Sequence, residues 1–333
     1  MRLPARLTIA ALAVAVASSV AACSSNAGLA YDGGGRSPSA AATARIPPGT
    51  EAIKTAPAGP AIKTAPAGPV IEVTGAPAGV KAKTGILADA TTGQVLWADL
   101  PNAERPIASI TKVMTALLVI RAGDLDRKIT VPKAVLNYVA KYDGNSVGLV
   151  PGQTLTADQL LYALLLESAC DAAYTLATAY GPGLPAFVAK MNALAAQLGL
   201  TQTHFTSPDG LPYPTEYSTY STPADLVKLG EIAMRYPDFS SIVDAQDYNL
   251  PKGDGHGHYW FGNDNALIGS YPGAVGIKTG YTDVAGHCLL FEAVRGGRTL
   301  IGVVLDSPPT GPDAGAQDAA KILNWGFALK QTG

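Results

Sequence analysis

The sequence predicts an α+β fold, in which an antiparallel sheet flanked by terminal helices stands beside an all-helical lobe. Two observations lead to this prediction. Segments with the composition of strands occur near residues 84–97 and 274–305, at the two ends of the compact region. The segments between them, from residue 109 to residue 235, have the apolar spacing of helices.

The composition is that of a globular protein with a sizeable core. The chain has 333 residues and is 47% hydrophobic, and its 24 basic residues nearly balance its 26 acidic ones. Because no long run of one charge occurs, the sequence gives no electrostatic reason to expect nucleic acid as a partner.

Residues 1–22 have the features of a bacterial export signal. Arg2 and Arg6 precede an apolar stretch at residues 7–22, which is short for a membrane-spanning helix of about 20 apolar residues. The stretch ends in Val20-Ala21-Ala22-Cys23, which resembles a lipobox. We therefore expect lipidation of Cys23 and anchoring at the outer face of the cytoplasmic membrane. An ordinary cleaved signal with an incidental cysteine is the alternative.

Residues 23–79 are predicted to be a disordered tether that starts at the lipidated cysteine. They are rich in Ala, Pro and Gly and contain a direct repeat of nine residues, at 52–60 and 61–69. Such a composition buries too little apolar surface to offset the entropy lost on ordering. The catalytic domain is expected to comprise residues 80–333. Its two cysteines, Cys170 and Cys288, are expected to be free thiols.

The elements of this domain follow from local patterns. Strands are expected at residues 84–90 and 94–97, on either side of a Thr-Thr-Gly turn. Residues 109–122 are apolar on nearly every face, which is typical of a buried helix. The remaining helices are expected at residues 156–166, 169–179, 184–198, 222–235 and 316–329, and the remaining strands at 274–282, 287–294 and 298–305. The first of these helices opens with a capping box, Thr156 to Gln159.

The segment Ser109-Ile110-Thr111-Lys112 is the strongest candidate for chemistry. Residues three apart on a helix share one face, so the two polar side chains are expected to meet. Burial in an apolar helix disfavours a charged ammonium group, and a neutral lysine can accept the proton of a serine hydroxyl. Ser109 and Lys112 are therefore predicted to form an activated nucleophile without a histidine.

Lys278-Thr279-Gly280 is the second candidate, within the apolar strand expected at residues 274–282. A lysine and a threonine on a strand can bind a substrate carboxylate, and glycine allows a peptide to approach the backbone. The tripeptide also occurs at Lys83-Thr84-Gly85, which we interpret as a chance copy.

A third motif, Ser168-Ala169-Cys170, lies between two predicted helices. Ser-x-x-Lys, a Ser-x-Asn-like turn and Lys-Thr-Gly, in this order, resemble the motifs of the serine penicillin-recognising enzymes. The wider sequence resembles the low-molecular-weight D-alanyl-D-alanine carboxypeptidases over about residues 80–330. The matching stretches are residues 92–96, 106–115, 158–165, 187–192, 198–205, 207–211 and 276–282. The resemblance implies a β-lactamase/DD-peptidase-like fold.

The resemblance also implies a mechanism. Ser109 would attack the carbonyl between two D-alanines of a peptidoglycan stem peptide and form an acyl-enzyme, with Lys112 as base and Ser168 as proton relay. Water as acceptor gives carboxypeptidase action, and an amine gives transpeptidation. β-Lactam antibiotics would be covalent inhibitors, and no cofactor or metal is implied.

By the same resemblance, substrate is held by the strand around the Lys-Thr-Gly motif. Lys278 and Thr279 would bind the terminal carboxylate, beside Gly280. The backbone N–H groups of Ser109 and Tyr281 would form the oxyanion hole.

Cys170 departs from the family pattern, in which the second motif ends in Asn. A thiol is a weak hydrogen-bonding group, so Cys170 cannot hold the substrate amide and Lys112 as an amide side chain would. Two interpretations stay open. Either Cys170 only packs, or it is a reactive thiol whose ionisation is favoured by the nearby lysines.

Other functions remain as alternatives. A class A-like β-lactamase shares the three motifs but needs a deacylating Glu, and Glu167 is not at the expected place. A catalytically weak relative could bind wall peptides or penicillin without turnover. Ser146 lies in a Gly-x-Ser-x-Gly pattern but is followed by a predicted loop, which disfavours an esterase. His256 and His258, two apart in a Gly-rich segment, are interpreted as part of a solvated loop.

Overall fold

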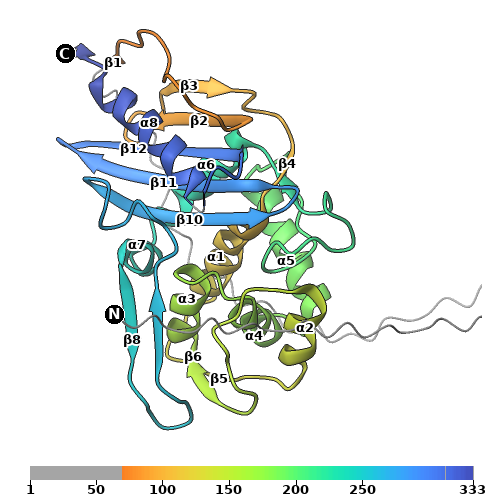
Figure 1. The fold of residues 1–333 in the computed structure, drawn as a ribbon. Helices are drawn as coiled ribbons and strands as arrows, with labels where there is room; N and C mark the ends of the chain where they lie inside the picture. Colours follow the sequence, from red (N-terminus) through yellow and green to blue (C-terminus); the bar gives the residue numbers. More distant parts are fainter. Residues whose placement is uncertain (1–69, 312, 333) are drawn as a thin grey trace, which may run out of the picture. The chain divides into compact units, whose positions relative to one another are not determined.

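A five-stranded antiparallel sheet organises the fold in the computed structural model, which describes residues 70–311 and 313–332 (Figure 1). Its strands lie in the order β10-β11-β12-β2-β3. They are β2 (Thr84–Asp89), β3 (Val95–Asp99), β10 (Ala274–Thr282), β11 (Gly286–Arg295) and β12 (Arg298–Ser307). Every neighbouring pair is antiparallel, so the predicted α+β class is confirmed.

Both faces of the sheet are covered, because side chains alternate between the two faces along each strand. On one face, Leu87, Phe291 and Leu300 belong to a core that includes residues of α8 (Ala314–Ala328). On the other, Ile86, Leu290 and Ile301 belong to the larger core, which α1 (Lys112–Ala122) and α6 (Pro223–Met234) share.

The helical lobe surrounds α1. Eight of the eleven residues of α1 are buried, as the apolar sequence of this segment predicts. The other helices of the lobe are α2 (Ala134–Tyr142), α3 (Ala157–Leu165), α4 (Cys170–Tyr180) and α5 (Leu184–Gln197). The predicted capping box is present, because Thr156 and Gln159 exchange hydrogen bonds at the start of α3.

Several elements were not expected from the sequence. They are α2, α7 (Pro237–Asp244) and pairs of short strands: β4 (Arg105–Pro106) with β7 (Tyr220–Ser221), β5 (Lys128–Thr130) with β6 (Thr154–Thr156), and β8 (Asp247–Leu250) with β9 (Tyr259–Gly262). Strands this short show too little alternation of apolar and polar residues to be predicted from sequence, because tertiary contacts determine whether they form. Within the described helices, no segment is long and apolar enough to cross a membrane.

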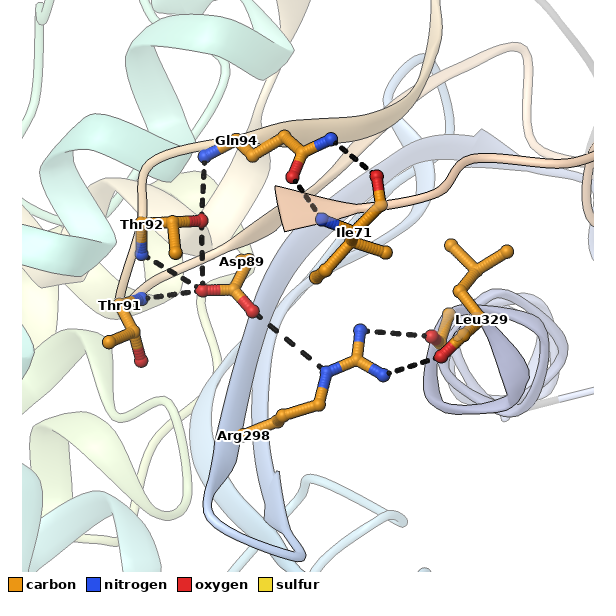
Figure 2. Close-up of polar contacts among 8 residues, drawn as sticks. Ile71, Asp89, Thr91, Thr92, Gln94, Arg298 and Leu329 are labelled. Atoms are coloured by element: carbon orange, nitrogen blue, oxygen red, sulfur yellow. Dashed lines mark hydrogen bonds and ion pairs between the residues drawn. The ribbon is translucent and has the colours of Figure 1, made fainter. Parts of the chain in front are cut away.

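The folded region begins earlier than predicted. Strand β1 (Val70–Ile71) pairs antiparallel with β13 (Gln331–Thr332), although residues up to 79 were assigned to the tether. The side chain of Gln94 accepts from the Ile71 N–H at 3.0 Å and donates to the Ile71 oxygen at 2.9 Å (Figure 2). Ile71 is buried in the core on the α8 side of the sheet, and this burial explains why the segment is held. The signal, Cys23 and most of the tether lie outside the described residues.

Arg298 ties the last helix to the sheet (Figure 2). Its guanidinium donates to the main-chain oxygens of Leu329 at 3.1 Å and Gly326 at 3.2 Å, at the C-terminal end of α8. Asp89 lies 4.0 Å from the same guanidinium, and its other oxygen accepts from the backbone of the following turn. A positive side chain at a helix C-terminus satisfies carbonyls that the helix leaves free.

Candidate active site

A cleft of about 780 Å³ contains most of the residues that the sequence selected. Its lining includes Ser109, Ser168, Cys170 and the segment from Thr279 to Tyr281. Lys112 and Lys278 lie behind this surface, with 0% and 1% of their area exposed. All three motifs therefore come together, although they are far apart in the sequence.

Ser109 lies in a single turn of 3₁₀-helix, η1 (Ala108–Thr111), which leads into α1. The predicted α-helix from residue 109 therefore begins at Lys112, three residues later than expected. Ala108, before the serine, has φ 45°, in the left-handed region that non-glycine residues seldom adopt. Such strain occurs mainly where the surrounding structure enforces it, as at functional sites.

The predicted nucleophile and its predicted base are in direct contact. Lys112 Nζ donates to Ser109 Oγ at 2.8 Å. It also donates to the main-chain oxygen of Asp209 at 3.0 Å and lies 3.5 Å from Cys170 Sγ. The three-residue spacing thus brings the two side chains together, as the sequence predicts.

Ser168 precedes α4 and also has a left-handed backbone, with φ 59°. Cys170 follows as the first residue of α4, and its N–H donates to the Asn145 oxygen at 2.8 Å. Burial raises the pKa of the Cys170 thiol to about 12, and the opposing effect of Lys112 is smaller. The interpretation of Cys170 as an activated thiol is therefore disfavoured, and a packed, weak acceptor is favoured.

Lys278 is the second buried cation of the site. Burial, and then repulsion from Lys112, lower the pKa of Lys278 to about 7, while the Asp264 carboxylate acts in the opposite direction. Lys278 Nζ donates to Thr279 Oγ1 at 3.2 Å, and Thr279 faces the cleft. The lysine can therefore reach a ligand beside Thr279.

Strand β10 lies at the edge of the sheet, next to η1. A Cβ atom on Gly280 would lie 2.9 Å from the Ile107 oxygen and 3.1 Å from the Ser109 nitrogen. Only glycine allows the strand to pass so close to Ser109. The second Lys-Thr-Gly copy lies at the start of β2, which β11 and β12 separate from β10, so it is not on the strand that passes Ser109.

A loop without an assigned role completes the site. In residues 207–211, Asp209 provides the carbonyl that contacts Lys112, and its carboxylate accepts from Tyr138 Oη of α2 at 2.8 Å. Sequence reasoning matched this loop to the family but gave it no function, and it missed α2. The helical spacing of Val135, Tyr138 and Tyr142 was the signal available for α2.

The alternative sites find little support in the geometry. Ser146 lies in an exposed loop, where its hydroxyl donates to Asp171 Oδ2 at 2.6 Å, and neither a strand before it nor a helix directly after it forms an elbow. Glu167 accepts from the Gly262 N–H at 3.0 Å and is not among the residues that line the cleft. Neither Ser146 nor Glu167 is among the residues that line the cleft.

Comparisons with known proteins agree with this geometry. The D-alanyl-D-alanine carboxypeptidase family matches residues 71–309. A D-alanyl-D-alanine carboxypeptidase of Streptomyces sp. strain K15 is 41% identical over 250 residues, which cover 72% of this chain and 84% of that protein. The D-alanyl-D-alanine carboxypeptidase DacB2 of Mycobacterium tuberculosis is 42% identical over 253 residues, covering 74% and 83% of the two chains.

Solved structures extend the likeness to the fold. The Streptomyces K15 DD-transpeptidase is 39% identical, with a TM-score of 0.71 over 77% of this chain and all of that one. A putative penicillin-binding protein homologue of Mycobacterium tuberculosis is also 39% identical, with a TM-score of 0.68 over 80% and 97% of the two chains.

Proposed function

This chain belongs to the D-alanyl-D-alanine carboxypeptidase family and is a serine-type DD-peptidase, and on that premise we propose that Ser109 is its nucleophile and Lys112 its base. The observation that supports these roles is the contact of 2.8 Å between Lys112 Nζ and Ser109 Oγ, at the edge of the cleft. A buried amine that has lost its proton can accept one from the hydroxyl it touches.

In the acylation step, Ser109 Oγ attacks the carbonyl carbon between the two terminal D-alanines and gives its proton to Lys112 Nζ. The backbone N–H groups of Ser109 and Tyr281 stabilise the oxyanion, each contributing about 3 kcal/mol. The C–N bond then breaks. Ser168 relays the proton from Lys112 to the departing amine of D-alanine, and the stem peptide stays attached to Ser109 as an ester.

Lys278 and Thr279 are proposed to bind the terminal carboxylate of the substrate. Their side chains meet at the cleft, and β10 is an edge strand to which an extended peptide can add. Gly280 and Tyr281 would lie along this peptide. Cys170 also lines the cleft, where it would offer the substrate amide only a weak hydrogen-bonding partner.

The acceptor decides the product. Water on the ester gives trimmed stem peptides, and an amine from a second stem peptide gives a cross-link. A β-lactam would acylate Ser109 in the same way. Its ring-opened product has no departing fragment, so the ester remains in the cleft and the enzyme is inhibited.

We also propose that the protein is exported and lipid-anchored at the outer face of the cytoplasmic membrane. The support is the sequence of residues 1–22 and the cysteine that follows them. Mass analysis of membrane-expressed protein tests this directly. A mature N-terminus at Cys23 with added lipid is expected, and a mass without lipid would contradict the anchor.

The enzymatic proposal is tested by intact mass after mixing the full chain with benzylpenicillin. A stable adduct is expected in the wild type and none in Ser109→Ala. Consumption of the drug without an adduct would favour a β-lactamase. An adduct together with no cleavage of a D-Ala-D-Ala peptide would favour a binding-only relative.

A further inference from the structure

The orientation of Lys112 depends on its hydrogen-bond partners. Lys112 Nζ donates to Ser109 Oγ in the structure, and the proposed base is the neutral amine, which has one lone pair and two N–H donors. In that form the lone pair faces Ser109 only if both donors are directed elsewhere. The two other neighbours of Nζ are the Asp209 main-chain oxygen, at 3.0 Å, and Cys170 Sγ, at 3.5 Å.

These two neighbours differ in strength. A thiol sulfur is a weak acceptor, whereas a main-chain carbonyl is a strong one. The direction of the Lys112 lone pair therefore depends mainly on where the Asp209 oxygen is held. In a site with an amide at position 170, a second strong acceptor would share this task.

The loop that carries this oxygen is fixed from several sides. Gly210 packs so closely on η1 that a Cβ there would lie 1.9 Å from the Ala108 oxygen. Thr115 Oγ1 of α1 donates to the Pro208 oxygen at 2.6 Å. The Asp209 carboxylate accepts from the Leu211 N–H at 3.1 Å. These contacts hold the loop against η1 and α1.

Tyr138 anchors the same loop from the helical lobe. Its hydroxyl, on α2, donates to Asp209 Oδ2 at 2.8 Å, and its ring packs on Tyr174 with centroids 4.8 Å apart. Asp209 is buried, with 1% of its area exposed. Burial and the Asp209 charge raise the pKa of Tyr138, so the hydroxyl keeps its proton. Without this donor the buried Asp209 carboxylate would lose a hydrogen bond, which favours movement of Asp209 toward another donor.

We propose that Tyr138 and Asp209 are positioning residues, which hold the Asp209 main-chain oxygen where it directs the Lys112 lone pair at Ser109. This inference rests on the proposed role of Lys112 as base. It assigns to a tyrosine on α2 the orienting task that Cys170 performs only weakly.

The test is the acylation rate of the full chain by benzylpenicillin in five proteins: wild type, Tyr138→Phe, Cys170→Asn, the double variant, and Tyr174→Phe. Tyr138→Phe is expected to slow acylation about tenfold to a hundredfold, because small misplacements of a catalytic group have effects of this size. Cys170→Asn in the Tyr138→Phe background is expected to recover most of the rate, since an amide oxygen supplies a second strong acceptor. Tyr174→Phe, a matched change in the same aromatic cluster, is expected to acylate like the wild type.

Two outcomes would overturn the inference: normal acylation in Tyr138→Phe, or a loss that Cys170→Asn does not recover, which would mean a purely structural role. Circular dichroism checks that the variants fold. If Tyr138→Phe does not fold, Asp209→Asn replaces it, with a slower rate and the same recovery expected. A wild type that is not acylated at Ser109 would instead refute the proposed function, and the inference with it.

Discussion

Lys278 and Thr279, neighbours on the edge strand β10, direct their side chains to one point, where Nζ donates to Oγ1 at 3.2 Å. This contact places a lysine with a lowered pKa beside the cleft. The positive charge that Lys278 offers a substrate carboxylate therefore changes near pH 7.

The pH dependence of catalysis follows from this pKa. Burial lowers the pKa of Lys278 to about 7, so the free enzyme loses this positive charge as the pH rises through 7. We expect kcat/KM for a D-Ala-D-Ala peptide to fall on the alkaline side of about pH 7, because this ratio reports ionisations of the free enzyme.

Lys278→Arg is expected to move this fall to higher pH, since arginine keeps its proton. Lys83→Arg, in the other Lys-Thr-Gly segment, should leave the profile unchanged. A value of kcat/KM that stays constant from pH 7 to pH 9 in the wild type would argue against Lys278 as the carboxylate-binding cation.

Gly280→Ala tests the close approach of β10 to Ser109. The added methyl group would lie 2.9 Å from the Ile107 oxygen and 3.1 Å from the Ser109 nitrogen, so η1 or β10 must move. We expect acylation by benzylpenicillin to slow about a hundredfold, measured by stopped-flow or mass. Gly257→Ala is the matched control, because its nearest neighbour would be Gln153 Nε2 at 3.7 Å. Equal rates in the two variants would contradict this geometry.

Glu292 makes stability depend on pH. Burial, and then the nearby Glu231, raise the pKa of Glu292 from 4.5 to about 7. Between these values the folded state keeps a proton that the unfolded chain has released, so the free energy of unfolding falls as the pH rises from about 4.5 to about 7.

Glu292→Gln removes the titrating group, so the variant binds no proton at this position in either the folded or the unfolded state. The free energy of unfolding of the variant, minus that of the wild type, should therefore rise between about pH 4.5 and about pH 7. Urea titrations at several pH values measure this difference. Glu104→Gln, a change at an exposed position, controls for the loss of one carboxyl group. A difference between Glu292→Gln and wild type that does not vary with pH would show that Glu292 titrates normally.

Arg298→Met tests the tie between α8 and the sheet. The change removes two hydrogen bonds to main-chain oxygens and leaves Asp89 without its cation. We expect a loss of about 2–4 kcal/mol in the free energy of unfolding, measured in urea. Lys330→Met, at an exposed position near the same end of α8, should change it little. A loss no larger than that of the control would mean that helix packing alone holds α8.

Cys170 should react slowly with thiol reagents in the folded protein, because burial raises its pKa to about 12 and the thiolate is the reactive form. Once modified, it should block acylation of Ser109, since Cys170 lines the cleft beside Lys112. Peptide mapping distinguishes it from Cys23 and Cys288. Unchanged acylation in protein fully modified at Cys170 would refute the second expectation.

The sequence predicted the elements whose signals are local. The bounds of β10 were predicted correctly, and those of β11 and β12 to within two residues, because a Gly-Gly turn separates two long apolar strands. The contact of Lys112 with Ser109 was also predicted, because it depends only on the spacing of two residues along one helical turn.

The rest of the site depends on contacts that leave no mark on residue types. The acceptor that Asp209 offers Lys112 is a backbone oxygen, which every residue has. Its anchor, Tyr138, comes from a helix that lies 71 residues away in the sequence. The behaviour of Cys170 was open for a similar reason, because the balance between burial and a nearby lysine is decided only by the folded surroundings.

The pairing of β1 with β13 determines where mechanical load enters the domain. Tension on the chain before Val70 acts first on the short strand pair that β1 forms with β13, here called the ribbon. It also acts on the two hydrogen bonds between the Gln94 side chain and the Ile71 backbone. Gln94 leads into β3, and β10 forms the opposite edge of the five-stranded sheet. Under the N-terminal anchoring proposed above, tension would open this ribbon first, at the end of the sheet away from β10 and Ser109.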